Sequence, residues 1–526
     1  MDARRPPLIT ALLDPARYPH PVAQVSCIET HGAWVLLAGD HAYKIKKPVR
    51  LPFMDFSTLA LRRAACLAEI RVNRRFESAN PATHLYLAAL PLVGTPEAPR
   101  WGQPGTDDGE AIEFAVHMRR FDEAGRLDHV GQRGALTPAH LHALARRMAD
   151  FQAHAAVAPA DGPWGHPADN LALARDNLTT LHSHFTHAPD LARLGALARW
   201  TETCAARLAP LMQQRLHDGR VREGHGDLHL ANLTLLDGEV VPFDAIEFND
   251  ALRWIDVASD MAFPWMDLLD HGQPGLANGL LCEWLDASGD ASALAVLPFY
   301  ATYRALVRAK VAAIRWQQLA QGANAAPATP PSAEARGAHL QAQAYVELAL
   351  RIAQPPAPQL VITHGLSGSG KTHASSRWLQ AEPTGRAVRL RSDVERKRLH
   401  GLAAHEASGS GLGTGLYSPQ SHTDTYQHLL ARTRALLQDG WTVLVDAAFL
   451  RRAERTAFAE IARAQGCPFH ILAPEAPLAV LRERIRQRQA RGGDASEATL
   501  AVLEQQIGWL EPLDATERAW CLPTPG

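Results

Sequence analysis

The 526-residue sequence contains no long apolar run and no closely spaced pair of cysteines. The first absence argues against a membrane-spanning helix, which needs about 20 consecutive, mostly apolar residues. The six cysteines are scattered without a C-x-x-C pair, which argues against a zinc site or a disulfide framework. The first residues also lack the apolar stretch of a signal peptide, so we expect a cytoplasmic protein with no membrane partner.

A strong excess of charge of either sign is missing as well. The 53 Lys and Arg residues nearly balance the 55 Asp and Glu residues, which leaves a net charge of −2. This balance argues against nucleic acid as a partner of the whole chain. Residues 359–526 carry 20 basic and 17 acidic residues, whereas the preceding residues carry 33 and 38. A mildly basic C-terminal part suits an anionic substrate.

A chain of this length is too long for one hydrophobic core, so two to four domains are expected. Residues 354–358 are proline-rich and predict a semi-rigid linker. Before the linker we expect a small lobe over 1–120, with the alternating apolar runs of an antiparallel sheet, and a mainly helical large lobe over 121–353. Residues 359–526 alternate strands with helices, which predicts an α/β domain with a parallel sheet.

The same patterns predict individual elements. Strands are expected at 33–37, 41–45, 84–90, 111–118, 360–362, 387–390, 442–445 and 469–472. Helices are expected at 58–76, 138–155, 191–214, 337–353, 420–437, 452–465 and 478–490. Residues 321–335 are of low complexity and predict a disordered loop between two helices.

The most informative motif lies at residues 365–372, which fit G-x-x-x-x-G-K-[ST] between an apolar run and a segment that can open a helix. This is the context that a phosphate-binding loop requires. Glycines allow backbone N–H groups to face the phosphates, Lys371 reaches the outer phosphates, and Thr372 can ligate Mg²⁺. We therefore predict ATP and Mg²⁺ as cofactors, with the nucleotide bound by Gly365, Gly368, Ser369, Gly370, Lys371 and Thr372.

Two carboxylates are expected beside this loop. Asp393 lies in the polar, basic loop 391–397 after the second strand, where it could take a proton from an acceptor hydroxyl or cap a helix. Asp446 ends a wholly apolar strand, as does a carboxylate that organises Mg²⁺. Arg396 and Lys397 could bind an anionic acceptor.

A second phosphotransfer motif lies in the first half of the chain. His225, Asp227 and Asn232 fit H-x-D-x-x-x-x-N, and Asp244 follows an apolar strand twelve residues after Asn232. In this pattern Asp227 would accept the proton of an attacking hydroxyl, while Asn232 and Asp244 would bind Mg²⁺.

Such a site also needs a lysine on an interior strand, paired with a glutamate on a helix. Lys44 and Lys46 share one face of the expected strand 41–45 and its extension, because strand side chains alternate. We choose Lys44, which lies deeper in the apolar run, and expect Glu69 as its partner.

Residues 21–320 resemble the aminoglycoside-phosphotransferase and choline-kinase branch of the protein-kinase-like fold, which implies an α+β N-terminal half. The family loop H-G-D-x-x-x-x-N and the later Asp are matched by Asp227, Asn232 and Asp244. Residues 254–258 resemble the later D-x-A element, in which Asp256 would brace the loop. The sequence departs from the protein-kinase pattern at residues 29–34, which replace the glycine-rich turn and contain one glycine.

Residues 359–526 resemble small P-loop kinases of the gluconate-kinase, zeta-toxin and polynucleotide-kinase type, which implies an α/β P-loop NTPase fold. These kinases share an Asp-x-x-Arg after the second strand, matched by Asp393 and Arg396. In this class a lid brings an arginine onto the transferred phosphate, and Arg488 and Arg491 are the candidates, with a solvated helix face as the alternative. The whole chain is similar to bacterial aminoglycoside phosphotransferase/ATP-binding fusion proteins.

The expected function is that of an ATP- and Mg²⁺-dependent two-domain phosphotransferase acting on a hydroxyl of a small metabolite. One alternative is a polynucleotide 5′-hydroxyl kinase in the C-terminal half, with Trp378, Tyr417 and Tyr426 as candidate stacking residues. The other is a non-catalytic, ATP-gated regulatory protein.

Overall fold

The structure is a computed structural model that describes residues 5–51, 54–77, 80, 83–321, 332–404, 406, 416, 418–491 and 498–523. It divides into two compact units, each described by itself below. The first contains residues 1–136, 154–169 and 211–263, and the second contains 137–153, 170–210 and 264–526. The expected linker lies inside the second unit, so the domain boundaries proposed from the sequence stay predictions.

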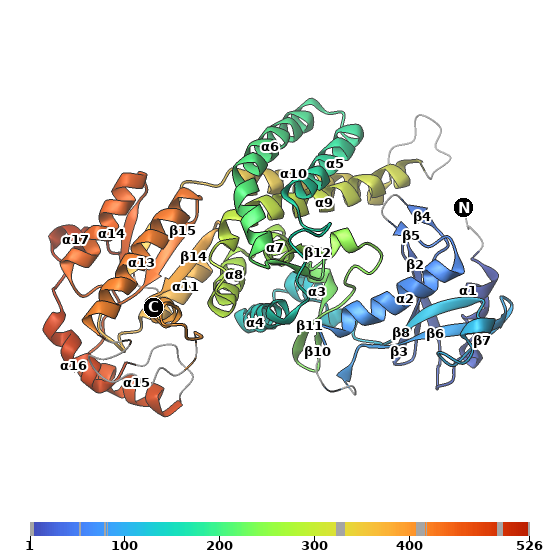
Figure 1. Cartoon of the computed structure of the whole chain (residues 1–526), viewed down its shortest axis with the longest axis horizontal. Coiled ribbons are helices and arrows are strands. Elements are labelled where there is room, and N and C mark those ends of the chain that lie inside the picture. The colour runs from blue at the N-terminus through green and yellow to red at the C-terminus, as the bar shows by residue number, and fades with distance from the viewer. Residues whose placement is uncertain are drawn as a thin grey trace. The chain divides into compact units, whose positions relative to one another are not determined.

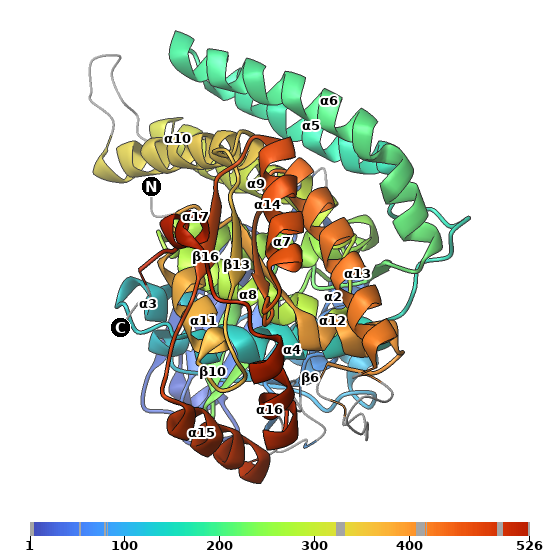
Figure 2. The same cartoon turned by 90° about the vertical axis from the view of Figure 1, so that its left-hand side faces the viewer.

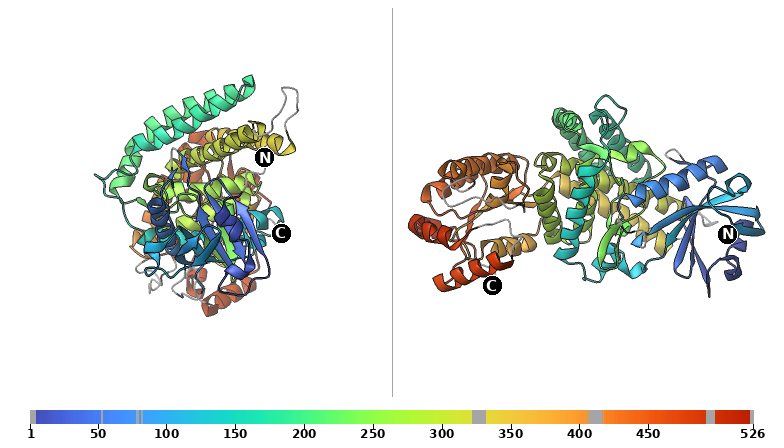
Figure 3. Two further views of the ribbon diagram at one scale, coloured as in Figure 1. Left: turned by 90° about the vertical axis from the view of Figure 1, so that its right-hand side faces the viewer. Right: turned by 60° about the horizontal axis from the view of Figure 1, so that its bottom comes forward.

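The first unit is built on a six-stranded antiparallel sheet in the order β1-β2-β3-β8-β6-β7. The strands are β1 (Val25–Glu29), β2 (Ala33–Ala38), β3 (His41–Lys46), β6 (Tyr86–Thr95), β7 (Ala98–Trp101) and β8 (Glu113–Arg119). Helix α2 (Leu59–Arg74) packs against β6 and β8, across one face of the sheet (Figures 1 and 3). Its N-cap is Thr58, whose hydroxyl accepts from the Leu61 N–H at 3.3 Å.

Two short antiparallel strand pairs follow in the same unit and flank the H-x-D-x-x-x-x-N motif. β9 (Val221–Glu223) pairs with β12 (Trp254–Asp256), and β10 (Leu233–Leu236) pairs with β11 (Glu239–Pro242). The loop 225–232 therefore connects β9, which is paired with β12, to β10, which is paired with β11. Smaller elements of this unit are α1 (Pro7–Ala11), β4 (Arg50–Leu51), β5 (Met54–Asp55) and α3 (Leu127–Gln132).

The second unit contains a four-stranded parallel sheet in the order β14-β15-β13-β16. The strands are β13 (Leu360–Thr363), β14 (Ala387–Arg391), β15 (Thr442–Asp446) and β16 (Phe469–Leu472). Helix α11 (Lys371–Ala381) lies on one side of the sheet, and α13 (Pro419–Gln438) and α14 (Arg452–Gln465) lie on the other (Figure 1). All residues of β13 and β15 are buried, as expected for parallel strands covered on both faces.

The other helices of the C-terminal part are α12 (Ser392–Leu399), α15 (Leu478–Arg491), α16 (Leu500–Trp509) and α17 (Ala515–Ala519), and Figure 2 shows α15 and α16 side by side. The helices between residues 137 and 353 are α4 (Pro138–His154), α5 (Pro167–His184), α6 (Ala188–His217), α7 (Val257–Asp270), α8 (Pro274–Ser288), α9 (Ala293–Gln321) and α10 (Ala333–Ala353). Helix α8 packs against α11 and β14, where Asn278 donates to Leu379 O at 3.1 Å.

The two predicted fold classes are confirmed, and the predicted elements match observed ones within a few residues. One element was wrong: residues 391–397, expected as a loop, are the end of β14 and most of helix α12. The predicted loop 321–335 lies largely outside the described residues, since α9 is followed to Gln321 and α10 begins at Ala333. Among the described helices, none is long and apolar enough to cross a membrane.

Candidate phosphotransfer sites

The phosphate loop connects the buried strand β13 to helix α11. Gly365, Gly368 and Gly370 have φ angles of 140°, 83° and 100°, a region that L side chains rarely adopt. A Cβ atom on Gly368 would also lie 2.8 Å from Leu481 O, so this position has no room for a side chain. The glycines of the motif are therefore required by the backbone path.

Lys371 is folded over this loop. Its Nζ donates to Gly365 O at 2.9 Å and to Leu366 O at 2.8 Å. Burial lowers the pKa of Lys371 to about 8, although the charges of Asp446 and Asp393 oppose the shift. The buried Ser369 Oγ has no hydrogen-bond partner in the described part of the chain. A desolvated cation and an unsatisfied hydroxyl on one loop fit the oxygen atoms of a polyphosphate.

The two predicted carboxylates lie on the wall of the same cavity, which has a volume of about 500 Å³. Asp446, at the end of β15, accepts from Ser375 Oγ at 3.1 Å. Asp393 lies in the first turn of α12 and accepts from Arg396 Nη1 at 3.2 Å. Thr372 lines this cavity too, so a hydroxyl and a carboxylate, both suitable Mg²⁺ ligands, are near the phosphate loop.

Basic side chains of α15 form part of the cavity wall. Arg484 donates to Gly368 O at 3.1 Å, and Arg488 donates to Ala498 O at 2.9 Å. Both arginines line the cavity, which places Arg488 where the sequence predicted a lid residue. The side chain of Arg491 lies outside the described residues.

One predicted substrate ligand of the C-terminal site is not placed to act. Lys397 is buried and is absent from the lining of the cavity, whereas its neighbour Arg396 lines it. Both residues lie on α12, where successive side chains point about 100° apart, so the neighbour of a cavity-lining residue can point away from the cavity. The prediction for Lys397 assumed a loop and is corrected.

Several cavity residues were missed because they come from distant helices. Gln506 on α16 accepts from the Ser367 N–H at 2.8 Å. Trp509 of the same helix is 44% exposed, and the guanidinium of Arg451 lies 5.6 Å from its ring. No local motif marks these positions. Gln506 and Trp509 reach the cavity from α16, and Arg451 reaches it from the start of α14.

In the first unit, Lys44 on β3 lies between two carboxylates. Its Nζ donates to Glu69 Oε1 at 2.9 Å and to Asp244 Oδ1 at 2.6 Å. Burial raises the pKa of Asp244, but the charge and hydrogen bond of Lys44 outweigh it, so the pKa is lowered. The expected pairing of Lys44 with Glu69 is thus present, and Lys44 also reaches a predicted metal ligand.

A second lysine extends this network. Lys46 donates to Glu69 and to Glu247, which the sequence did not single out. The side chain of Lys46 is 2% exposed and that of Lys44 is 16% exposed. Position within the apolar run thus did not predict which lysine is the more buried, and Lys44 is the lysine that contacts Asp244.

Hydrogen bonds within the same unit hold the residues of the H-x-D-x-x-x-x-N loop. Asn232 Nδ2 donates to Asp227 O at 2.9 Å and to Asp227 Oδ2 at 3.0 Å. This orientation leaves the amide oxygen of Asn232, the atom that can ligate a metal, directed away from the carboxylate. Asp227 thus has an adjacent amide donor.

The brace of this loop is Asp260 and not Asp256. Asp260 accepts from the N–H groups of His225 and Gly226 at 2.7 and 2.9 Å. Asp256 is instead buried in an ion pair with Arg215, with Nη2 and Oδ1 2.7 Å apart. The sequence placed the bracing carboxylate one helical turn too early.

Glu223, at the end of β9, joins the strand to three arginines. It accepts from Arg71, Arg75 and Arg253 at 2.8–3.1 Å. Burial raises its pKa, but hydrogen bonds and charges from these arginines lower it to about 2. This pKa lies below that of an unfolded-chain glutamate, so the ion pairs stabilise the fold at neutral pH, and their contribution to stability is lost progressively as the pH falls from about 5 to about 2.

We therefore expect Glu223→Gln to lower the free energy of unfolding at pH 7 by about 3 kcal/mol, because it breaks a buried ion-pair network. The loss should shrink between pH 5 and pH 2. Urea unfolding at several pH values measures both effects, with Glu202→Gln as a control in the exposed pair with Arg175, where about 0.5 kcal/mol is expected. A pH-independent difference would contradict this account.

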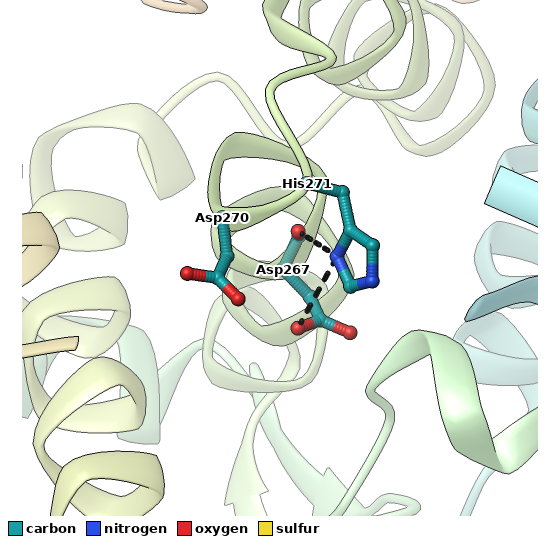
Figure 4. A group of neighbouring side chains, drawn as sticks. All are labelled: Asp267, Asp270 and His271. Atoms are coloured by element: carbon teal, nitrogen blue, oxygen red, sulfur yellow. Dashed lines mark hydrogen bonds and ion pairs between the residues drawn. The ribbon is translucent and has the colours of Figure 1, made fainter. Parts of the chain in front are cut away.

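A third group, Asp267, Asp270 and His271, has the composition of a metal site (Figure 4). Asp267 and Asp270 lie in the last turn of α7 and His271 directly follows the helix, and the ligand atoms of the three residues lie within 4.8 Å of one another. His271 Nδ1, the ring nitrogen facing the carboxylates, is bonded to Asp267 O at 2.8 Å. Because a protonated Nδ1 cannot ligate a cation, we assign no metal to this group.

Comparison with known proteins finds a family model that matches the C-terminal part and a relative that matches most of the chain. Residues 360–513 match the AAA domain family. An uncharacterized protein of Mycobacterium tuberculosis is 29% identical over 494 residues, which cover 93% of this chain and 92% of the relative.

Among solved structures, a choline/ethanolamine kinase family protein from Mesorhizobium loti is 13% identical with a TM-score of 0.37, covering 65% of this chain and 95% of that one. The APS kinase CysC of M. tuberculosis, solved with AMPPNP and APS, is 21% identical with a TM-score of 0.21, covering 29% and 96%. The family match covers the part of the chain that carries the parallel sheet and the phosphate loop, where the sequence predicted a P-loop domain.

Proposed function

We propose that this chain is an ATP- and Mg²⁺-dependent phosphotransferase that transfers the γ-phosphate to a hydroxyl of a small metabolite at its P-loop site. The observation that carries the proposal is the single cavity lined by Lys371, Thr372, Asp393 and Asp446. A phosphate-binding lysine, a candidate base and two candidate metal ligands around one space are the parts that phosphoryl transfer needs.

Each residue has a separate task in this proposal. Lys371 and the glycine N–H groups bind the outer phosphates, and Thr372 and Asp446 would hold Mg²⁺. Bound Mg·ATP supplies the phosphoryl group and neutralises charge that develops during transfer. Asp393 takes the proton of the acceptor hydroxyl, and Arg488 stabilises the phosphate in transit. Arg396 binds an anionic group of the acceptor.

We propose the same chemistry for the N-terminal site, with Asp227 as base, Asn232 and Asp244 as Mg²⁺ ligands, and Lys44 on the phosphates. The contact between Lys44 and Asp244 supports this assignment, because it joins the phosphate-binding and metal-binding positions through a distance of 2.6 Å. Glu69 keeps Lys44 in place from the helix side.

The alternative of a polynucleotide kinase has less support. Trp378 packs against the buried cluster of Val361, Leu444 and Leu472, and Tyr426 is 8% exposed. Tyr417 lies outside the described residues. A purely regulatory role has no use for a complete set of carboxylates at both sites.

The screen that tests the main proposal measures ATP consumption by the full-length chain with a panel of hydroxylated metabolites; no consumption above background with any acceptor would count against it.

For the N-terminal site we expect Asp227→Asn to lower turnover there about 10²–10⁴-fold, because the variant lacks the proton acceptor. The thermal midpoint should change little, since an amide can keep the hydrogen bonds of the carboxylate. The measurement is acceptor-dependent ADP release in a Lys371→Ala background, which isolates this site. Undiminished turnover would remove Asp227 from the mechanism.

A further inference from the structure

A histidine–glutamate pair lies on the wall of the P-loop cavity and has no task in the mechanism above. His422 is in the first turns of α13, and Glu454 is the third residue of α14. The two side chains meet with His422 Nε2 and Glu454 Oε1 2.8 Å apart, and both line the cavity. Neither residue belongs to the phosphate loop or to its two carboxylates.

The pair is held in a fixed orientation. Glu454 Oε2 accepts from the Arg451 N–H at 3.4 Å, which ties the carboxylate to the start of α14. The ring of His422 lies 4.6 Å from the ring of Tyr426. The Tyr426 hydroxyl accepts from the Phe449 N–H at 3.2 Å, so the tyrosine is anchored as well. The histidine side chain is still 37% exposed, which leaves part of it open to the cavity.

The hydrogen bond to Glu454 sets the chemistry of the imidazole. A carboxylate accepts, so Nε2 carries the proton and Nδ1 keeps its lone pair in the neutral ring. A histidine oriented in this way by a carboxylate is suited to accept the hydrogen of a hydroxyl group. His422 thus presents an oriented acceptor to a cavity that must bind a hydroxylated substrate.

His422 shares the cavity with Asp393, and this determines what kind of acceptor fits. Asp393, His422, Tyr426 and Glu454 all line this one cavity. Asp393 itself accepts from Arg396 and serves the hydroxyl that is phosphorylated. Because His422 and Asp393 line the same cavity, a molecule with two hydroxyls can present one to each of them.

We propose that His422, oriented by Glu454, binds a second hydroxyl of the acceptor, and that the substrate of the P-loop site is a polyol. This proposal rests on the proposed function and names its acceptor class. The hydroxyl donates to Nδ1 of His422, while the hydroxyl that is phosphorylated faces Asp393. No covalent step is assigned to the pair.

The test uses the full-length chain with Mg·ATP and five probes: 1-propanol, 1,2-propanediol, glycerol, ribose and myo-inositol. We expect phosphorylation of probes with two or more hydroxyls only. For the best probe, His422→Ala should raise KM about tenfold, the value of one lost hydrogen bond, with kcat and the KM for ATP nearly unchanged. Glu454→Gln should raise the same KM less, and His422→Gln, which keeps an acceptor, should restore part of it.

A deoxy analogue of the best probe separates binding from a structural effect. Removing the second hydroxyl should raise KM about tenfold in the wild type and not further in His422→Ala, because both changes delete one hydrogen bond. The matched control is His428→Ala. His428 lies on the same helix as His422 and also forms a hydrogen bond to a glutamate, with its Nε2 2.9 Å from Glu395 Oε2, but it does not line the cavity. It should leave KM for the probe unchanged.

Additive effects of the analogue and the variant, or equal use of 1-propanol and the polyols, would refute the proposal. Where no probe is phosphorylated, calorimetry on the chain loaded with AMPPNP gives the same comparison as dissociation constants. If no polyol binds there, the proposal is wrong, whereas AMPPNP binding that is lost in Lys371→Ala would leave the proposed nucleotide site intact.

Discussion

Lys371→Ala is expected to weaken nucleotide binding at the P-loop site about hundredfold and to abolish transfer there. Lys371 is the cation of the phosphate loop, and its Nζ is held 2.9 Å from Gly365 O and 2.8 Å from Leu366 O. Hydrogen bonds from a desolvated cation to phosphate are among the strongest in proteins, so their loss costs about 3 kcal/mol. Titration of the full-length chain with AMPPNP measures the effect as the loss of one class of sites.

The control for this variant is Arg482→Ala. Arg482 lies on α15, does not line the cavity and pairs with Glu504 at 2.8 Å. The substitution therefore removes a cation from a helix that contributes to the cavity wall, without changing the cavity itself. Its nucleotide affinity should equal that of the wild type. Equal affinities of Lys371→Ala and the wild type at both classes of sites would contradict the assignment of residues 365–372 as the nucleotide site.

The second large effect concerns the division of labour between Asp393 and Asp446. Asp393→Asn is expected to lower kcat about 10²–10⁴-fold, the range for a lost general base, while the affinity for ATP is spared. Asp446→Asn is expected to raise the Mg²⁺ concentration needed for half-maximal rate. The difference follows from position, because Asp446 ends a fully buried strand and Asp393 opens helix α12 beside Arg396.

The two substitutions are matched, since each replaces an aspartate on the same cavity by its amide. Initial rates measured against Mg²⁺ concentration for both variants separate the roles. If Asp393→Asn shifts the Mg²⁺ half-saturation and Asp446→Asn does not, the assignments are reversed.

Features that depend on a short stretch of sequence were predictable. The phosphate loop is one, because its glycines, Lys371 and the flanking strand and helix are contiguous and each has a local physical reason. The H-x-D-x-x-x-x-N loop is another, since Asp227 and Asn232 are five residues apart and share a hydrogen bond.

Features that depend on packing between distant segments were not predictable. Asp256 and Asp260 are both carboxylates near the same loop, and only the path of α7 decides which one meets the N–H of His225. Similarly, His422 and Glu454 are 32 residues apart on two helices, and no spacing in the sequence pairs them. Lys397 was misplaced because a helix, and not a loop, follows β14.

The central claim is that the chain transfers the γ-phosphate of ATP to a hydroxyl at the P-loop site. The most direct test incubates the full-length chain with ATP labelled at the γ-phosphate and a polyol panel, and follows the label into an acceptor. The account predicts at least one acceptor that is labelled by the wild type and by Asp227→Asn but not by Lys371→Ala. If every labelled acceptor is still labelled by Lys371→Ala and none by Asp227→Asn, the account is contradicted and all of the activity belongs to the N-terminal site.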